Sequence, residues 1–172
     1  MRLEPVIALP NAWTSVSGQL ALHLFEGHLS LADMEHMHDL AGRWLTKHPE
    51  KRVEMVVILP SGARMTLEER QRMVRLIKQG EPQRSASCTV ILAEGLLGSV
   101  QRSILTGLVL LAPPPHPAKV FATVHDGTRW LYPHARELMG PRLDLDELLV
   151  AIDVNVAMFR ARTRDDAASV LR

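Results

Sequence analysis

Apolar residues in this chain form short continuous runs that alternate with longer stretches in which they recur every three or four positions. The runs at 13–16 and 20–25 flank a Gly-containing turn, which predicts an N-terminal β-hairpin. Further runs at 53–59, 88–93 and 119–122 predict strands, and the first of these is continuous enough to be covered on both faces. The chain therefore begins with a hairpin and continues with single strands separated by other elements.

Helix starts are marked by a hydroxyl residue followed three positions later by an acid, the pattern of a capping box. These pairs are Ser30 with Asp33, Thr66 with Glu69, and Thr123 with Asp126. The first helix is expected to end near residue 48, the second at Gly80, and the third pair opens a short helix that Pro133 stops. A further helix over 96–111 is apolar on nearly all sides, which predicts burial on more than one side.

Strands that alternate with helices predict an α/β fold with a mixed, mostly parallel β-sheet, an N-terminal β-hairpin and helices packed on the sheet. We expect a single domain over 1–140, a C-terminal helical extension over 141–164 and a frayed tail over 165–172. The apolar stripe of the extension consists of Leu145, Leu148, Leu149, Ile152, Val156 and Phe159. Its spacing mimics a heptad repeat but covers only two heptads, too few to specify a coiled coil, so docking onto the same chain is favoured. A homodimer through helix 96–111 or helix 144–160 stays open as the alternative.

Composition narrows the class of protein. The 172 residues carry a formal net charge of +1 and 47 % hydrophobic residues, which argues against disorder and against binding of nucleic acid. The single cysteine, Cys88, cannot form an internal disulfide and is interpreted as a small core residue. With no signal-peptide pattern at the N-terminus and no apolar run of about 20 residues, a cytoplasmic protein without a membrane span is expected.

No pattern for catalysis, a metal or a cofactor emerges. His36 and His38 lie two positions apart on a helix and point in opposite directions, so they cannot share one metal ion. The glycines at 95 and 98 lack the Lys-Ser/Thr ending of a P-loop. The paired acids near helix starts complement the helix dipole. We therefore expect a protein that is not an enzyme and has no catalytic residue, metal or cofactor.

The helix that begins at Thr66 carries an unusual arrangement of charge. Its apolar arc is predicted to consist of Leu67, Met73, Val74 and Ile77, and Arg70 falls in the middle of this arc. One reading is that the long side chain of Arg70 extends out to water. The other is that Arg70 reaches an anion or a protein partner that docks at the Thr66 end of the helix. Arg72 and Arg75, on the opposite side of the helix, are further candidates for binding a partner.

The segment Met55-Val56-Val57-Ile58-Leu59, which leads through Gly62 to Thr66, resembles the STAS domain of anti-sigma factor antagonists and the related SpoIIAA-like proteins. The resemblance covers residues 13–131. It extends to Val120-Phe121, Thr123 and Trp130-Leu131, which are similar to the closing strand and helix of SpoIIAA-like domains.

The resemblance implies a non-catalytic regulatory module that docks a protein partner, of a kinase-like anti-sigma type or another signalling protein. In the family, a phosphorylatable serine lies at the start of the helix after the third strand. Thr66 is the hydroxyl at the matching place, although the family's aspartate and following glycine are absent. Thr66 is thus a candidate phospho-acceptor, and the helix that it begins is the candidate docking edge. The alternative function is a carrier of a small hydrophobic ligand or lipid in a pocket beside helix 96–111.

Overall fold

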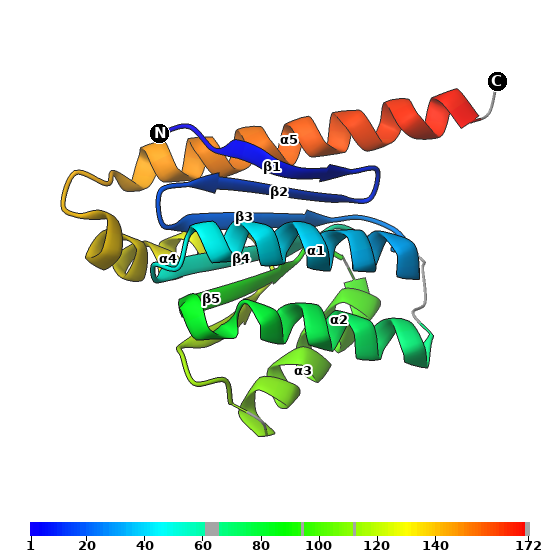
Figure 1. Ribbon diagram of the computed structural model, residues 1–172, viewed down its shortest axis with the longest axis horizontal. Coiled ribbons are helices and arrows are strands. Elements are labelled where there is room, and N and C mark those ends of the chain that lie inside the picture. Colours follow the sequence, from blue (N-terminus) through cyan, green and yellow to red (C-terminus); the bar gives the residue numbers. More distant parts are fainter. Residues whose placement is uncertain (61–65, 94, 112, 171–172) are drawn as a thin grey trace.

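Six strands form one continuous sheet in the computed structural model, which describes residues 1–60, 66–93, 95–111 and 113–170 (Figure 1). The strands are β1 (Glu4–Leu9), β2 (Ala12–Ser17), β3 (Leu20–Phe25), β4 (Arg52–Ile58), β5 (Arg84–Ile91) and β6 (Ala118–Phe121). They lie side by side in chain order. Strands β1 to β3 pair antiparallel and β3 to β6 pair parallel, so the mixed, mostly parallel sheet with an N-terminal hairpin is confirmed.

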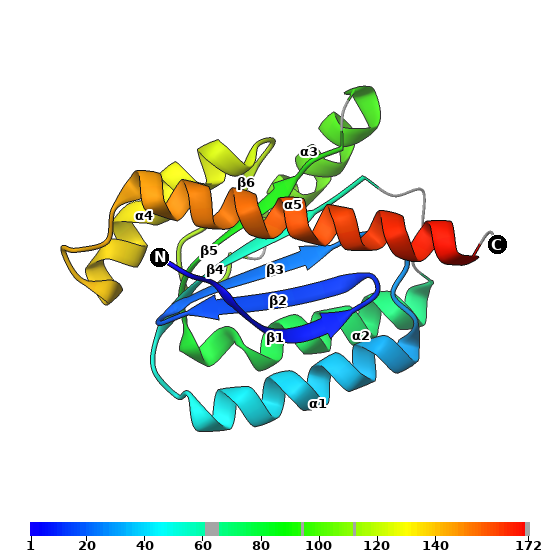
Figure 2. The same ribbon diagram turned by 90° about the horizontal axis from the view of Figure 1, so that it is seen from above.

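Helices cover both faces of the sheet. They are α1 (Leu31–Lys47), α2 (Leu67–Gln79), α3 (Gly95–Leu111), α4 (Val124–Met139) and α5 (Leu145–Val170), with a short 3-10 turn, η1 (Glu81–Gln83), after α2. Helices α1 and α2 lie on one face, and α4 and α5 lie on the opposite face (Figure 2). Helix α3 lies beyond α2 and packs near β5 and β6.

The predicted helix starts are present. Ser30 and Thr66 each form a capping box with the acid three residues later, and Thr123 caps α4 by accepting a hydrogen bond from the backbone N–H of Asp126. Gly80 is the C-cap of α2, as predicted. Because a cap of this kind contributes about 1 kcal/mol, local sequence defines where these helices begin.

Helix α5 docks on its own chain through the predicted stripe. Leu148, Ile152 and Phe159 are fully buried against α4 and the sheet. A buried hydrogen bond of 3.0 Å, from the hydroxyl of Ser15 to the side-chain oxygen of Asn155, joins β2 to the middle of the helix. The helix continues to Val170, through residues for which a frayed tail was expected.

Three elements differ from the sequence-based expectations. Strand β1 was not predicted; its Pro5 is tolerated because β1 is an edge strand with a register shift between Pro5 and Ile7. Strand β5 begins at Arg84 rather than at Cys88, since polar residues extend it. Helix α4 continues through Pro133 rather than stopping there. A proline inside a helix costs about 3 kcal/mol, and burial of the following turn around Ala135 offsets that cost.

Within the described residues, no helix combines the length and the apolar character needed to cross a membrane.

Candidate functional site

The two faces of the sheet differ in chemistry because alternate residues of each strand point to opposite sides. Toward α4 and α5, the side chains are apolar and fully buried, as in Leu22, Met55 and Val90. Toward α1 and α2, the same strands present His23, Glu54 and other polar residues. A sheet face buried under helices yet lined with polar groups calls for a structural or functional reason.

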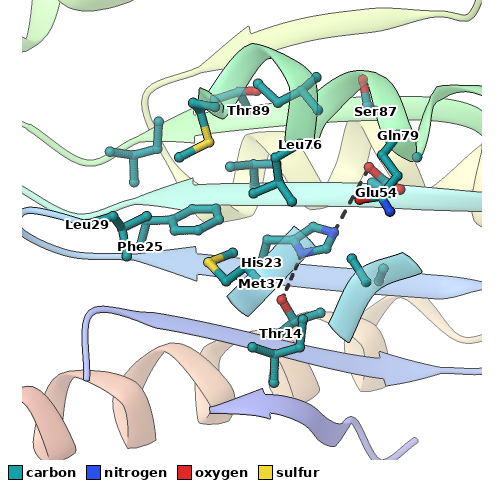
Figure 3. A pocket seen from close by; sticks show the side chains of 18 of the residues that line it. Thr14, His23, Phe25, Leu29, Met37, Glu54, Leu76, Gln79, Ser87 and Thr89 are labelled. Atoms are coloured by element: carbon teal, nitrogen blue, oxygen red, sulfur yellow. Dashed lines mark hydrogen bonds and ion pairs between the residues drawn. The ribbon is translucent and has the colours of Figure 1, made fainter. Parts of the chain in front are cut away.

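A cavity of about 470 Å³ lies between this second face and helices α1 and α2. That volume falls within the range of about 300–1,000 Å³ that is usual for ligand sites. Most of its lining is apolar and includes Phe25, Leu29, Met37, Met73 and Leu76. In Figure 3, Phe25 and Leu29 lie at one end of the site and Glu54, Gln79 and Ser87 at the other, with His23, Met37 and Leu76 between them.

The register of the parallel strands explains this gradient. One cross-strand row consists of Ala21, Glu54 and Ser87, the next of His23, Val56 and Thr89, and the third of Phe25, Ile58 and Ile91. Before the first row lie Arg52 and Arg84, at the amino ends of β4 and β5. The cavity is therefore charged at the amino ends of the strands, mixed in the middle and apolar at their carboxyl ends.

The charged end is a buried network around Glu54. One carboxylate oxygen accepts a hydrogen bond of 2.9 Å from Nε of Arg52, and the other accepts one from Nε of Arg84. Both guanidinium groups also reach the carboxyl end of α2, where Arg52 donates to the Gly80 carbonyl at 3.5 Å and Arg84 to the Ile77 carbonyl at 3.4 Å. The network thus ties β4 and β5 to the end of α2, where cations complement the helix dipole.

Protonation in this network is set by burial and charge. Burial alone raises the pKa of Glu54, but the positive groups around it, His23 when protonated together with Arg84 and Arg52, lower that pKa below its usual value. Burial lowers the pKa of His23, and the two arginines add to that effect while Glu54 opposes it. Glu54 is therefore ionised and His23 neutral near pH 7.

His23 lies between a hydroxyl and a carboxylate. Its Nδ1 is 3.0 Å from the hydroxyl of Thr14, and its Nε2 is 4.0 Å from the Glu54 carboxylate (Figure 3). A catalytic relay has the same three groups, but it needs a carboxylate that hydrogen-bonds the imidazole. Here 4.0 Å is too long for that bond, and both Glu54 oxygens already bind arginine. The arrangement suits binding better than activation of a nucleophile.

A second buried histidine lies next to this end of the cavity. His116, in the segment before β6, is 3.0 Å through its Nε2 from the hydroxyl of Ser87, and burial lowers its pKa. The cavity opens to solvent beside α2, where its lining residues Ile58, Ile77 and Gln101 are exposed. A ligand could enter there without crossing the packed face of the sheet.

The residues singled out from the sequence lie apart from this cavity. Thr66 is exposed at the start of α2, where its side chain accepts a hydrogen bond of 3.2 Å from the backbone N–H of Glu69. Arg72 forms an ion pair with Glu35 of α1, and Arg75 is exposed. The side chain of Arg70 is outside the described part of the structure, as is the turn at 61–65 that precedes Thr66.

The predicted apolar arc of α2 was wrong in part. Leu67 and Val74 are 70 % and 49 % exposed and lie away from the cavity, whereas Met73 and Leu76 line it and Ile77, 52 % exposed, lies at its entrance. The helix leans on α1 rather than burying its widest apolar stripe in the sheet. The most apolar side of this helix and the side that faces the cavity overlap only in part, so the apolar pattern alone did not identify the cavity-facing side.

Other sequence-based expectations concern α3, the cysteine and metals. From α3 and the segment before it, the cavity is lined by Ala93 and Gln101, while the side chains at 104, 105 and 108–111 are outside the described part. Cys88 is buried, and burial raises its pKa to about 12, which suits a core residue. Among the described residues, no three His, Cys, Asp or Glu side chains are grouped to hold a metal ion.

The sequence did contain a signal for the residues that were missed. His23 and Glu54 are the titratable residues inside the two runs 20–25 and 53–59, and each run was treated as uniformly apolar. A charged residue in a central strand is rarely buried without a partner. Arg84 was missed for another reason, since the strand that holds it was predicted to begin four residues later.

No protein-family model matches the sequence, and no curated protein matches it. In structure, the chain is similar to an uncharacterized protein of the DUF3478 family with a SpoIIAA-like fold from Shewanella loihica PV-4. The TM-score is 0.54 and the identity 16 %, and the match covers 76 % of this chain and 96 % of the other. At that identity the likeness shows the fold alone. The chain therefore has the SpoIIAA-like fold, as the STAS-like resemblance of its sequence predicted.

Proposed function

We propose that this protein is a non-catalytic binding module that holds a small amphipathic ligand between the sheet and helices α1 and α2. The observation that carries the proposal is the cavity itself, which is of ligand size, is mostly apolar and has its polar groups gathered at one end. A domain that needed only a stable core has no use for such a space, because native interiors are otherwise closely packed.

The position of the cavity also supports a ligand site between the sheet and helices α1 and α2, rather than the pocket beside helix 96–111 that the sequence suggested. The sheet and two helices enclose it, and its exposed lining at Ile58 and Ile77 gives it an entrance. The network of hydrogen bonds around Glu54 keeps the polar end of the cavity ordered without a ligand. We therefore place the ligand over β3, β4 and β5 instead of against the apolar side of helix 96–111.

A cavity-filling substitution tests this function. Val56→Phe places a ring in the middle of the cavity, and Val150→Phe adds the same ring on the exposed side of α5, where Val150 is 62 % exposed. Calorimetric titration with three ten-carbon amphiphiles, decanoate, decanol and decyltrimethylammonium, measures binding. We expect at least one to bind the native protein, and Val56→Phe to weaken its affinity at least tenfold while Val150→Phe leaves it unchanged. Absence of binding by all three, or equal loss in both variants, contradicts the proposal.

The second candidate function is docking of a protein partner along α2, with Thr66 as its phospho-acceptor. It is favoured by the exposed apolar side chains of Leu67 and Val74, which follow the exposed Thr66 along the outer side of the helix. Arg75 adds a positive charge beside these side chains. Arg72 supports the idea less, since it already pairs with Glu35.

Pull-down from cells with matched variants tests the docking surface. Val74→Glu with Arg75→Ala alters the outer side of α2, and Val154→Glu with Arg160→Ala makes a similar change on exposed α5. Docking along α2 predicts loss of a partner with the first pair alone. Thr66→Glu and Thr66→Ala then test phosphorylation: retention of the partner by both variants to the same extent argues against a phospho-switch.

A further inference from the structure

The charged end of the cavity holds more positive than negative charge. Arg52 and Arg84 carry one positive charge each, and Glu54 supplies one negative charge between them. The carboxyl end of α2 contributes about half an elementary negative charge. About half a positive charge is therefore left without a counter-charge from these groups; the ring of Trp44, 5.3 Å from the Arg52 guanidinium, stabilises part of it, and an anion would compensate the rest.

Hydrogen-bonding capacity is also left over at this end. Arg52 lines the cavity and is only 4 % exposed, yet its Nη1 has no hydrogen-bond partner among the described residues. The neighbouring Nη2 makes only the long bond of 3.5 Å to Gly80. With the Thr14 hydroxyl donating to Nδ1, neutral His23 carries its one N–H at Nε2, which is too far from Glu54 for a hydrogen bond. Arg52 and His23 thus offer two donors toward one small volume.

Resting on the proposed function, we propose that the ligand is an amphiphilic monocarboxylate, whose head group binds the Nη1 edge of Arg52 and Nε2 of His23. Its apolar tail follows the cavity past Val56 toward Phe25 and Ile58. A carboxylate matches the planar edge of a guanidinium group, and the charge-assisted bonds that result are stronger than neutral ones.

The same groups disfavour other head groups. A cationic head would meet the surplus positive charge of Arg52 and Arg84. A doubly charged phosphate would overcompensate it and be repelled by Glu54, which stays ionised. A neutral alcohol would leave the positive charge of Arg52 without a counter-charge and would make only neutral hydrogen bonds to its Nη1. A single negative charge is therefore the best match.

The length of the cavity sets the shape of the tail. Arg52 and Ile58 mark its two ends along β4, and six residue steps of about 3.3 Å separate them by about 20 Å. Leu29, Met37 and Met73 close the apolar part from the helix side. This is a long channel rather than a round pocket, so an extended aliphatic chain fits it better than a compact ring.

Calorimetric titration of the full chain with decanoate, decanol and decyltrimethylammonium tests the head group, because the three share one tail. We expect decanoate to bind at least tenfold more tightly than decanol and the cation not to bind. Equal binding of decanoate and decanol overturns the carboxylate assignment while leaving a ligand-binding cavity in place. Binding of none of the three overturns the proposed function itself.

Variants of Arg52 sharpen the test, and the ratio of decanoate to decanol affinity is the readout, since damage to the cavity alters both ligands alike. Arg52→Gln removes the charge and Arg52→Lys keeps it without the planar fork. We expect the ratio to fall toward one in Arg52→Gln and to an intermediate value in Arg52→Lys. The matched control Arg75→Gln, on the exposed side of α2, keeps the native ratio. A native ratio in a folded Arg52→Gln protein, with the fold checked by circular dichroism, contradicts the proposal.

Discussion

The face of the sheet that meets α4 and α5 and the face that meets α1 and α2 are built by the same strands with opposite results. On the first, Leu22, Met55 and Phe159 are fully buried in one continuous apolar cluster. On the second, polar groups and a cavity of about 470 Å³ separate the strands from the helices. Because strand residues alternate between faces, one sequence supplies a packed layer for stability and an open layer for binding.

The largest expected difference concerns the packed layer. Phe159→Ala on α5 should destabilise the fold by about 3–5 kcal/mol, as is usual when a buried aromatic ring is removed. Phe25→Ala, on the cavity face, should cost less than half of that, because one side of its ring already borders the cavity. Urea unfolding of the two variants measures both costs. Equal costs would show that the cavity face contributes as much to stability as the packed face.

Substitutions in the charge network around Glu54 should cause the next largest loss of stability. Glu54→Gln leaves Arg52 and Arg84 without their shared carboxylate, and breaking a buried ion pair in this way costs about 3 kcal/mol. Replacing all three, as Arg52→Met, Glu54→Leu and Arg84→Met, should recover part of that loss because no buried charge is left. Thermal unfolding compares the two proteins. A triple variant less stable than Glu54→Gln would contradict this account of the network.

Two alanine-to-leucine substitutions should change the stability of the fold in opposite directions. Ala135→Leu forces a larger side chain into the packed layer under α4 and should destabilise by about 1–3 kcal/mol. Ala41→Leu on α1 extends into the cavity and should stabilise by about 1 kcal/mol, while weakening binding of decanoate. Chemical unfolding and calorimetry measure the two effects. Destabilisation by Ala41→Leu would mean that the cavity is smaller in solution than in the structure.

The smallest expected effect is a dependence of stability on pH that arises from the cavity face. The folded-state pKa values of His23 and His116 lie below the ordinary value of about 6.5, so the unfolded chain binds protons first as pH falls. Stability is therefore complete above about pH 6.5 and is lost as pH falls through the folded-state values. The charged groups around the two rings are Glu54, Arg52, Arg84, Glu81 and Lys51.

Unfolding measured between pH 7.5 and pH 5 checks this dependence. His23→Gln and His116→Gln should each flatten the curve, and the double variant should flatten it further. Glu54 adds a second loss at lower pH, because its own folded-state pKa is also lowered. A double variant that keeps the native slope would assign the dependence to other groups.

Much of the fold could be predicted from local sequence patterns, but the cavity and its polar residues could not. The capping pairs at Ser30 and Thr66 located α1 and α2 because a cap depends on residues three positions apart. The cavity depends on the neighbours of each strand and on the height of α2 above the sheet, which no local pattern reports. Glu54 was visible as a charge within an apolar run, but Arg84 becomes its partner only through the register of β4 and β5.

The docking residues illustrate the same limit. Thr66 was chosen from the family resemblance and Arg72 and Arg75 from the charge pattern of one helix, and none of the three lines the cavity. Of the residues of that helix that do, Met73 and Ile77 were expected only as part of its apolar arc, and Leu76 was not singled out. Helical periodicity identifies the sides of a helix, but the partner elements decide which side faces inward.

Helix α2 carries five apolar side chains, at 67, 73, 74, 76 and 77, and none of them is classed as buried. Only Met73 and Leu76 of these pack against the buried cluster on this face of the sheet, so separation of α2 exposes less apolar surface, and requires less free energy, than global unfolding. Such a helix can act as a gate. The residence time of a bound ligand would then be governed by how often α2 lifts, a rate that can be tuned by its contacts to α1 without any change in the residues that contact the ligand.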